Sequence, residues 1–243
     1  MKGVILAGGQ GTRLRPLTYI TNKHLLPVYN KPMIYYPLER MAEAGVKDVM
    51  IVSGKGHTGQ FLELLRSGKD FGLNLSYAVQ EEPGGIAQAL SLAENFADGG
   101  RVLVILGDNI FEDSVAAVVK EFENRDGGMI FLKEVSDPTP YGVPEMKEGK
   151  IVKIIEKPDN PPSKYAVLGI YLYDNSVFDI VRELVPSARG ELEITDVNNR
   201  YLAEGKLGYH ILEGWWGDGG ESFDSLLEAG ELAAKLHRKL RKS

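Results

Sequence analysis

Glycines and cations gather near the start of the chain in an order that suits the binding of a polyphosphate. An apolar run at 4–7 leads directly into Gly-Gly-Gln-Gly at 8–11, which indicates a buried strand that ends in a glycine-rich loop. Glycines in such a loop let backbone N–H groups approach a ligand closely. Arg13, Arg15 and Lys23 follow soon after. Exposed amides and fixed cations therefore converge where anionic oxygens would lie.

Two well-known glycine motifs do not match this loop. A Walker loop ends in Gly-Lys-Ser or Gly-Lys-Thr, whereas Gly11 leads into Thr12 and Arg13. The Rossmann fingerprint needs a third Gly or Ala at the position where this chain has Leu14. An ordinary strand-to-loop turn with solvated charges stays open on the glycines alone. The cations that accompany the glycines, Arg13 and Lys23, favour a phosphate site instead.

Two aspartates are candidates for holding a divalent cation. Asp108 follows the apolar run at 102–106, where burial makes a lone charge costly unless water or a cation meets it. Asp218 is bracketed by glycines. An oxygen-rich site suits Mg²⁺, which takes few carboxylates and completes its shell with water and substrate phosphate. An alternative stays open, in which Asp108 caps a helix near Glu112 and Asp218 makes a glycine turn.

The first half of the chain alternates apolar runs with amphipathic segments. This pattern predicts an α/β fold with a mixed, mostly parallel central sheet and helices on both faces. Ligands of such sheets bind beyond the carboxyl ends of the strands, where residues 8–9, 53–54 and 107–108 fall. The predicted strands are 4–7, 48–53, 73–79 and 102–106, and the predicted helices are 33–44, 58–67 and 86–96.

The second half has a different pattern, which predicts a small antiparallel lobe. A turn at 147–150 joins the short strands 143–146 and 151–155 into a hairpin. No internal repeat, low-complexity tract or long linker separates the two halves. The other predicted elements are strands at 129–135, 166–173 and 207–212 and helices at 176–185, 195–204 and 222–242.

The composition excludes several classes of function. The 28 basic and 34 acidic residues leave a formal charge of -6, which argues against general affinity for nucleic acid. The absence of cysteine excludes disulfides, thiolate metal sites and a cysteine nucleophile. The sequence shows neither a signal-peptide pattern nor an apolar run of membrane-spanning length. We expect a cytoplasmic protein that binds small molecules, with neither nucleic acid nor membrane as a partner.

Motifs along nearly the whole chain match one known family. The opening signature is Leu-Ala-Gly-Gly at 6–9, Gly-Thr-Arg-Leu at 11–14 and Lys-x-Leu-Leu-Pro at 23–27. The later matches are Gln80, Gly-Ile-Ala-Gln-Ala at 85–89, Leu-Gly-Asp-Asn at 106–109, Tyr-Gly-Val at 141–143, Glu-Lys-Pro at 156–158 and the segment 187–196. Together these motifs resemble the sugar-1-phosphate nucleotidylyltransferases, and most closely the short glucose-1-phosphate thymidylyltransferases.

The resemblance implies a Rossmann-like nucleotidyltransferase fold with a single domain over residues 1–243. Its nucleotide-binding part would span about 1–135, its sugar-phosphate-binding part about 136–220, and its terminal helix about 222–242. Longer relatives carry further C-terminal helices that help form a regulatory nucleotide site. One helix follows Asp218 here. We therefore expect a nucleotide-sugar product to inhibit at the active site alone.

The resemblance also assigns residues to both substrates and to the metal. The implied catalytic residues are Arg13, Lys23, Asp108 and Lys157, and the implied Mg²⁺ ligands are Asp108 and Asp218. The implied nucleotide-binding residues are Leu6, Gly8, Gly9, Gly11, Thr12, Arg13, Gln80 and Gly85. The implied sugar-phosphate-binding residues are Tyr141, Gly142, Glu156, Lys157, Val167, Tyr171 and Arg189. His24 departs from the glutamine of the longer members, which leaves one nucleotide contact undefined.

The implied reaction transfers a nucleotidyl group from dTTP to glucose 1-phosphate and gives dTDP-glucose, a precursor in dTDP-rhamnose biosynthesis, and pyrophosphate. The sugar phosphate oxygen is already ionised near neutral pH, so a direct, Mg²⁺-dependent displacement needs no general base. A UTP-dependent or other sugar-1-phosphate nucleotidylyltransferase and a non-catalytic nucleotide-sugar sensor remain alternatives. The broken Rossmann fingerprint disfavours an NAD-dependent oxidoreductase. A homo-oligomer stays open.

Overall fold

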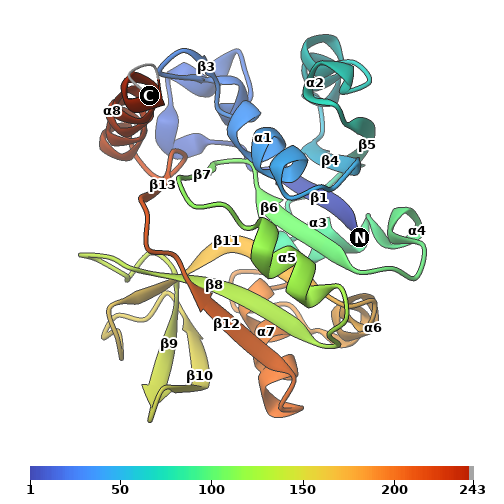
Figure 1. The fold of residues 1–243 in the computed structure, drawn as a ribbon, viewed down its shortest axis with the longest axis vertical. Helices are drawn as coiled ribbons and strands as arrows, with labels where there is room; N and C mark the ends of the chain where they lie inside the picture. The colour runs from blue at the N-terminus through green and yellow to red at the C-terminus, as the bar shows by residue number, and fades with distance from the viewer. Residues whose placement is uncertain (241–243) are drawn as a thin grey trace.

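One twisted sheet runs through the middle of the molecule in the computed structural model, which describes residues 1–240 (Figure 1). Within this described part, nine strands form the sheet. They are β1 (Lys2–Ala7), β4 (Asp48–Gly54), β5 (Asn74–Gln80), β6 (Val102–Leu106), β8 (Gly128–Glu134), β9 (Gly142–Lys147), β10 (Lys150–Glu156), β11 (Tyr165–Tyr173) and β12 (Leu207–Ile211). Their order is β10-β9-β11-β6-β1-β4-β5, while β8 pairs with β11, and β12 pairs with β8.

The centre of the sheet is parallel, as the continuous apolar runs predict. β1 lies between β4 and β6, and Ile5 is in register with Ile51 on one side and Ile105 on the other. All three side chains are fully buried. Because these strands run in one direction, their carboxyl ends and the loops that follow them meet at one edge of the sheet.

Helices cover both faces of the sheet, which confirms the predicted layers. Ile5 packs in one core cluster with Leu38 and Phe61, while Val4, its neighbour in β1, packs in a second cluster with Leu90. Alternate residues of β1 therefore serve opposite faces. The helices are α1 (Tyr35–Glu43), α2 (Thr58–Leu65), α3 (Ile86–Ser91), α4 (Glu94–Ala97), α5 (Ala116–Phe122), α6 (Ser176–Glu183), α7 (Ile194–Ala203) and α8 (Phe223–Leu240).

The predicted antiparallel part is present and continues the main sheet. β11 pairs antiparallel with both β6 and β8, and β9 joins β11 through Gly142 and Val167. β9 and β10 form the predicted hairpin. Its two-residue turn is Glu148-Gly149, and both residues have positive φ (49° and 74°), as a tight hairpin with a matching twist requires.

Several elements differ from the sequence prediction. The helix predicted at 86–96 is two helices, α3 and α4, with Leu92 and Ala93 between them. No helix was predicted where α5 lies. The small strands β2 (Pro27–Val28), β3 (Lys31–Pro32), β7 (Asn109–Phe111) and β13 (Trp216–Asp218) were also not foreseen. The reading of Asp108 as a helix cap is wrong, because Asp108 leads into β7 and the next helix begins at Ala116.

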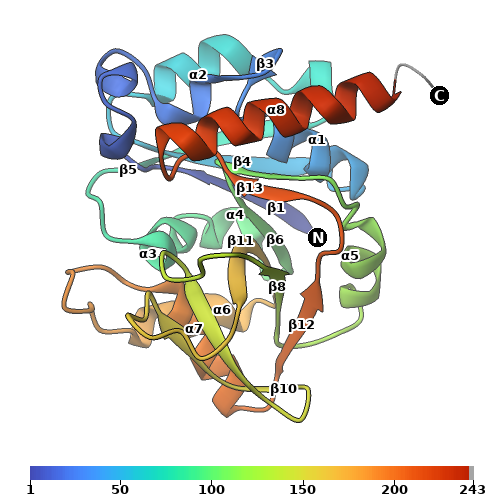
Figure 2. The ribbon, with the colours of Figure 1, turned by 90° about the vertical axis from the view of Figure 1, so that its left-hand side faces the viewer.

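The last helix packs on a small satellite core. Ala229 and Ala233 of α8 lie in a cluster with Val28, Met33 and Ile110. Figure 2 shows α8 at the opposite end of the molecule from α7 and β10. Besides these two alanines, the partly buried Leu226 of α8 packs against this core. The end of the predicted helix, at 241–242, lies outside the described residues.

The exposed side of α8 carries large apolar residues. Phe223 is 48% exposed and Leu227 is 64% exposed. Across residues 1–240 the structure contains no helix with the length and apolar character needed to cross a membrane.

Candidate active site

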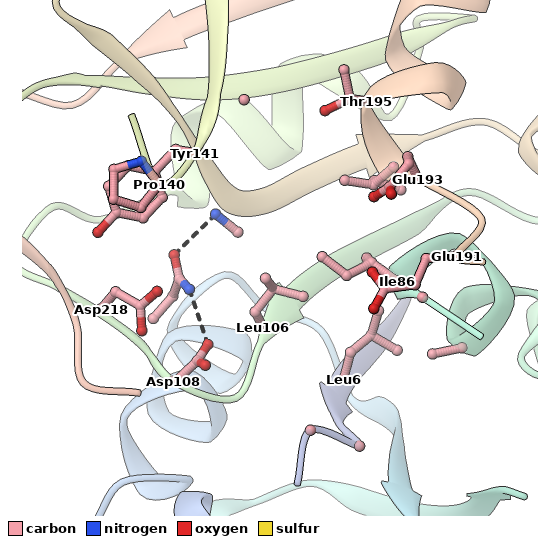
Figure 3. Close-up of a pocket in the computed structure, with 18 of the residues that line it drawn as sticks. Leu6, Ile86, Leu106, Asp108, Pro140, Tyr141, Glu191, Glu193, Thr195 and Asp218 are labelled. Atoms are coloured by element: carbon pink, nitrogen blue, oxygen red, sulfur yellow. Dashed lines mark hydrogen bonds between the residues drawn. The ribbon is translucent and has the colours of Figure 1, made fainter. Parts of the chain in front are cut away.

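A pocket of about 330 Å³ opens beyond the carboxyl ends of β1 and β6, where the sheet topology predicts a ligand site. Figure 3 shows Asp108 and Asp218 on one side of it and Glu191, Glu193 and Thr195 on the other. We call the first side, with Lys23, the aspartate end. We call the second side the glutamate end; its charged members are Glu156, Arg189, Glu191 and Glu193.

A buried ion pair forms the centre of the aspartate end. The Lys23 ammonium donates to Asp108 Oδ2 at 2.5 Å, and the two side chains are 16% and 9% exposed. Burial alone would lower the pKa of Lys23, but the Asp108 carboxylate raises it above its ordinary value. Burial opposes ionisation of Asp108 as well, yet Lys23 holds its pKa well below the usual range. Both groups therefore stay charged near neutral pH.

The second aspartate reaches the same end through an unforeseen strand. β13 pairs antiparallel with β7, and this pairing sets Asp218 opposite Asn109, the residue after Asp108. The Gly220 amide donates to Asp218 Oδ1 at 2.8 Å, which agrees with the glycine turn considered for this residue. Burial, and then the charge of Asp108, raise the pKa of Asp218 to about 7.

The donor set at the aspartate end fits Mg²⁺. Asp108 and Asp218 lie close enough for one charge to raise the pKa of the other, a repulsion that a divalent cation would remove. A Cβ at Gly220 would lie 2.7 Å from both Asp108 Oδ2 and Lys23 Nζ, so a glycine keeps this space open. In the described chain no cluster of three or more His, Cys, Asp or Glu is placed to hold a metal. A cation here would therefore have two carboxylate ligands and take the others from water and substrate, as Mg²⁺ does.

The glycine-rich loop contributes to the pocket with all but its last residue. Gly8, Gly9 and Gln10 line the pocket with Leu6 of the preceding strand, whereas Gly11 packs against Lys23. A Cβ at Gly11 would lie 2.9 Å from Lys23 Cβ, and its φ of 61° favours glycine. Gly11 therefore contacts the Lys23 side chain without lining the pocket itself.

Thr12 and Arg13 are exposed and lie outside the pocket lining. The Arg13 guanidinium donates to Glu221 Oε2, and Glu221 does line the pocket. Arg13 thus reaches the rim of the aspartate end through this carboxylate. The structure places it near the predicted site, engaged with an acidic residue of the chain itself.

Gln80 lies at the end of β5 and borders the pocket, as predicted. Its amide donates to the Gly85 carbonyl at 3.2 Å and to Gln88 Oε1 at 2.7 Å. Its own Oε1 lies directly against Gly8. Because both amide hydrogens are engaged, the orientation of this side chain is set by the protein, and Gly85 also lines the pocket.

His24 has a defined protonation state in the free protein. Its Nδ1 lies 2.6 Å from Asn22 Oδ1, and Asn22 is oriented by its own donation to the Ala7 carbonyl. Nδ1 is therefore the protonated nitrogen, and Nε2, 4.0 Å from Asp108 Oδ2, is an acceptor. Burial, together with the nearby charge of Lys23, lowers the pKa of His24 to about 3. A neutral, buried imidazole therefore lines the pocket beside Lys23.

Arg189 organises the glutamate end. It donates to Glu193 through Nε at 3.2 Å and Nη2 at 2.8 Å, and Nη2 also reaches Glu156 at 3.3 Å. Glu193 is buried and accepts a further bond from the Ser187 hydroxyl at 2.7 Å. The predicted phosphate-binding arginine is therefore held by carboxylates of its own chain, although its side chain is 42% exposed.

The remaining predicted sugar-phosphate residues also border the pocket. Glu156 accepts from the Thr195 hydroxyl at 2.5 Å. Lys157 has a left-handed backbone with φ of 45°, and its N–H donates to the Tyr141 carbonyl at 3.0 Å. Backbone strain of this kind in a non-glycine residue is often found at ligand-binding sites. The other predicted residues that line the pocket are Gly142, Val167 and Tyr171.

Sequence reasoning missed several residues that shape the site. Asn109 donates to Asp108 Oδ1 at 3.2 Å, the bond drawn to Asp108 in Figure 3, and accepts from the Gly169 amide at 2.9 Å. Glu193 and Thr195 hold Arg189 and Glu156. All three missed residues belong to motifs quoted for the family, so the signal was present without an assigned role. Glu221 had no such signal.

Comparison with known proteins decides the family. A family model described as nucleotidyl transferase matches residues 2–235. The chain belongs to the nucleotidyl transferase family. This nucleotidyl transferase is 48% identical over 240 residues to a glucose-1-phosphate thymidylyltransferase of Mycolicibacterium smegmatis, covering 97% of this chain and 83% of the relative. It is 45% identical over 237 residues to a Neisseria meningitidis protein of the same name, covering 96% and 82%.

Solved structures agree with the predicted fold of this nucleotidyl transferase. A Bacillus anthracis protein described as a glucose-1-phosphate thymidylyltransferase, in complex with sucrose, matches with a TM-score of 0.92 at 51% identity, over 96% of this chain and 95% of that one. A UDP-glucose pyrophosphorylase in complex with UDP-glucose matches with a TM-score of 0.86 at 25% identity, over 96% and 98%. The fold class and the family resemblance are confirmed, while the individual site residues stay predictions.

Proposed function

We propose that this nucleotidyl transferase transfers a thymidylyl group from dTTP to glucose 1-phosphate and releases pyrophosphate. The observation that carries the proposal is one pocket that is lined by Lys23 and two aspartates at one end, by Arg189 among glutamates at the other, and also by Lys157. The names of the most similar relatives support this choice of substrates. Nucleoside triphosphate substrates fit a cytoplasmic location.

The glutamate end would hold the nucleophile. Arg189 carries positive charge there, and Lys157, the residue after Glu156, also lines the pocket, so a sugar phosphate would receive donors from both. Glu156 would accept from sugar hydroxyls beside Tyr141 and Tyr171. The phosphate oxygen is already an anion, so these residues act by orienting it toward the α-phosphorus.

The aspartate end would hold the triphosphate. Lys23 lies inside the pocket, where it would neutralise charge that develops on the α-phosphate. Arg13, at the rim, would bind the leaving pyrophosphate. Asp108 and Asp218 would hold Mg²⁺, which when bound neutralises phosphate charge and orients the reacting oxygens.

Gln80 would contact the base. Thymine and uracil both carry an N3–H, for which the Gln80 Oε1 is a suitable acceptor. This contact therefore does not separate dTTP from UTP. The UTP-dependent alternative is kept for the test, since a UDP-glucose pyrophosphorylase shares the fold.

The test is a matrix of nucleoside triphosphates and sugar 1-phosphates, assayed by pyrophosphate release. We expect dTTP with glucose 1-phosphate to give the highest kcat/KM. A higher kcat/KM with UTP would show that the enzyme transfers a uridylyl group instead. If nucleotide sugar binds while no pair of substrates releases pyrophosphate, the chain is a sensor and not an enzyme.

A further inference from the structure

Glu221 stands out among the residues that line the pocket, because the reaction described above gives it no role. It is the third carboxylate on the side of the pocket that holds Asp108 and Asp218. A triphosphate carries several negative charges, so an additional carboxylate beside its site opposes its binding. In the free protein this carboxylate is paired with Arg13.

The backbone of both partners is fixed, so the contact is built into the fold. Arg13 lies in a single helical turn, Thr12–Leu14, and Leu14 in this turn is fully buried. On the other side, the Gly219 amide donates to the Asp108 carbonyl at 3.0 Å, which anchors the segment just before Glu221. The two side chains meet although 208 positions separate them in the sequence.

The two side chains are also free enough to part. Arg13 is 55% exposed and Glu221 is 28% exposed, whereas Lys23 and Asp108 are 16% and 9% exposed. Exposed ion pairs contribute little stability, and a phosphate group offers a guanidinium stronger, bidentate hydrogen bonds. An incoming phosphate therefore competes well for Arg13, while it competes poorly for a buried pair.

We propose that Glu221 is an affinity-setting residue that holds Arg13 in the free protein and releases it to the triphosphate. This inference rests on the proposed function, because it takes the triphosphate to bind beside Arg13. Between turnovers, the Glu221 carboxylate accepts the Arg13 hydrogen bond that a phosphate of dTTP accepts when dTTP is bound. It weakens the binding of dTTP and of pyrophosphate alike, and so favours the release of pyrophosphate.

Calorimetric titration of dTTP into four forms of the full chain tests this proposal: wild type, Glu221→Gln, Arg13→Ala and the double variant. Glu183→Gln is the matched control, since Glu183 pairs with Arg200 at 2.6 Å on the surface and lies outside the pocket lining. We expect Glu221→Gln to lower the Kd for dTTP about two- to fivefold, the scale of an exposed ion pair. The control should leave the Kd unchanged.

The double variant separates release of Arg13 from simple charge repulsion. The gain from Glu221→Gln should be larger when Arg13 is present than when it is alanine. An equal gain in both backgrounds means that Glu221 only repels phosphate, and this overturns the proposal. A Kd that rises or stays unchanged in Glu221→Gln overturns it as well.

Pyrophosphate release by the wild type distinguishes failure of this inference from failure of the proposed function. An active wild type with an unaltered Kd in Glu221→Gln contradicts only the role of Glu221. A wild type that binds no dTTP and releases no pyrophosphate contradicts the proposed function, and with it the ligand on which the role of Glu221 depends.

Discussion

The two ends of the pocket hold their charges in different ways. At the aspartate end, Lys23 and Asp108 form a buried pair, and Asp108 is further held by Asn109. At the glutamate end, Arg189 is 42% exposed and touches several carboxylates at once. Both ends contain fixed positive charge, but only the first is shielded from water.

This difference indicates which charged side chains can give up a partner within the protein in exchange for a substrate phosphate. A buried ion pair is costly to break, because either partner left alone would be a desolvated charge. An exposed arginine with several partners loses little when one of them leaves. We therefore expect changes to the buried Lys23 and Asp108 pair to affect both turnover and folding, and changes at the glutamate end to affect mainly the affinity for one substrate.

The largest effect is expected from Asp108→Asn. Loss of this carboxylate removes a predicted metal ligand and should lower turnover about a hundredfold or more. It also leaves Lys23 without its buried partner, so the free energy of unfolding should fall by about 3 kcal/mol. Turnover assays and urea denaturation measure the two effects.

Asp126→Asn is the matched control for this change. Asp126 pairs with Arg101 at 2.8 Å, but its side chain is 82% exposed. Its replacement should alter neither turnover nor stability by a measurable amount. Equal stability of Asp108→Asn and wild type would contradict the account of a buried pair at the aspartate end.

Asp218→Asn should lower turnover about as much as Asp108→Asn without the loss of stability. Its carboxylate is bonded to a backbone amide and is repelled by Asp108, so the native fold gains little from its charge. A chelator should abolish wild-type turnover for the same chemical reason. Full activity in chelator, or in the Asp218 variant, would remove Mg²⁺ from the proposal.

Gly220→Ala sharpens the comparison by adding volume to the aspartate end without changing its charge. The new Cβ would lie 2.7 Å from both members of the Lys23 and Asp108 pair, so we expect a loss of turnover of about tenfold. Gly59→Ala is the control, because no atom lies within 4 Å of a Cβ there. Gly59 is in helix α2, so its replacement should stabilise the protein by up to about 1 kcal/mol. Wild-type turnover in Gly220→Ala would show that this space is not needed.

The parts of the fold that sequence reasoning predicted are those with a strong local pattern. The apolar runs at 4–7 and 102–106 are fully paired, buried strands, and glycine loops follow them as expected. The strands β7 and β13 escaped prediction because three residues show no periodicity, and their pairing depends on a contact between segments far apart in the sequence. Family membership was predicted from the motifs and is confirmed.

The site residues also divide into those that a local sequence pattern predicted and those that depend on a distant contact. Asp108 and Gln80 lie in the pocket because each stands at the end of a predictable strand, whereas Lys23 was indicated only by its motif. The position of Arg13 was not predictable in the same way. Its direction is set by Glu221, which reaches it only through β13 and the turn that follows, and local sequence carries no information on that contact.

The smallest effects are expected at the glutamate end, where Lys157→Ala should raise the KM for glucose 1-phosphate about tenfold. The KM for dTTP should stay close to that of the wild type, since Lys157 lines the pocket directly after Glu156 of the glutamate end in the sequence. Arg13→Ala should lower kcat/KM for every triphosphate and leave the KM for the sugar phosphate nearly unchanged. Steady-state kinetics with each substrate varied in turn measure both.

This pair of variants tests the central claim most directly, namely that the two ends of one pocket bind different substrates. The account predicts opposite patterns, with the loss in Lys157→Ala confined to the sugar phosphate and the loss in Arg13→Ala following the triphosphate. Equal loss of affinity for both substrates in both variants would contradict the division of the pocket into two ends.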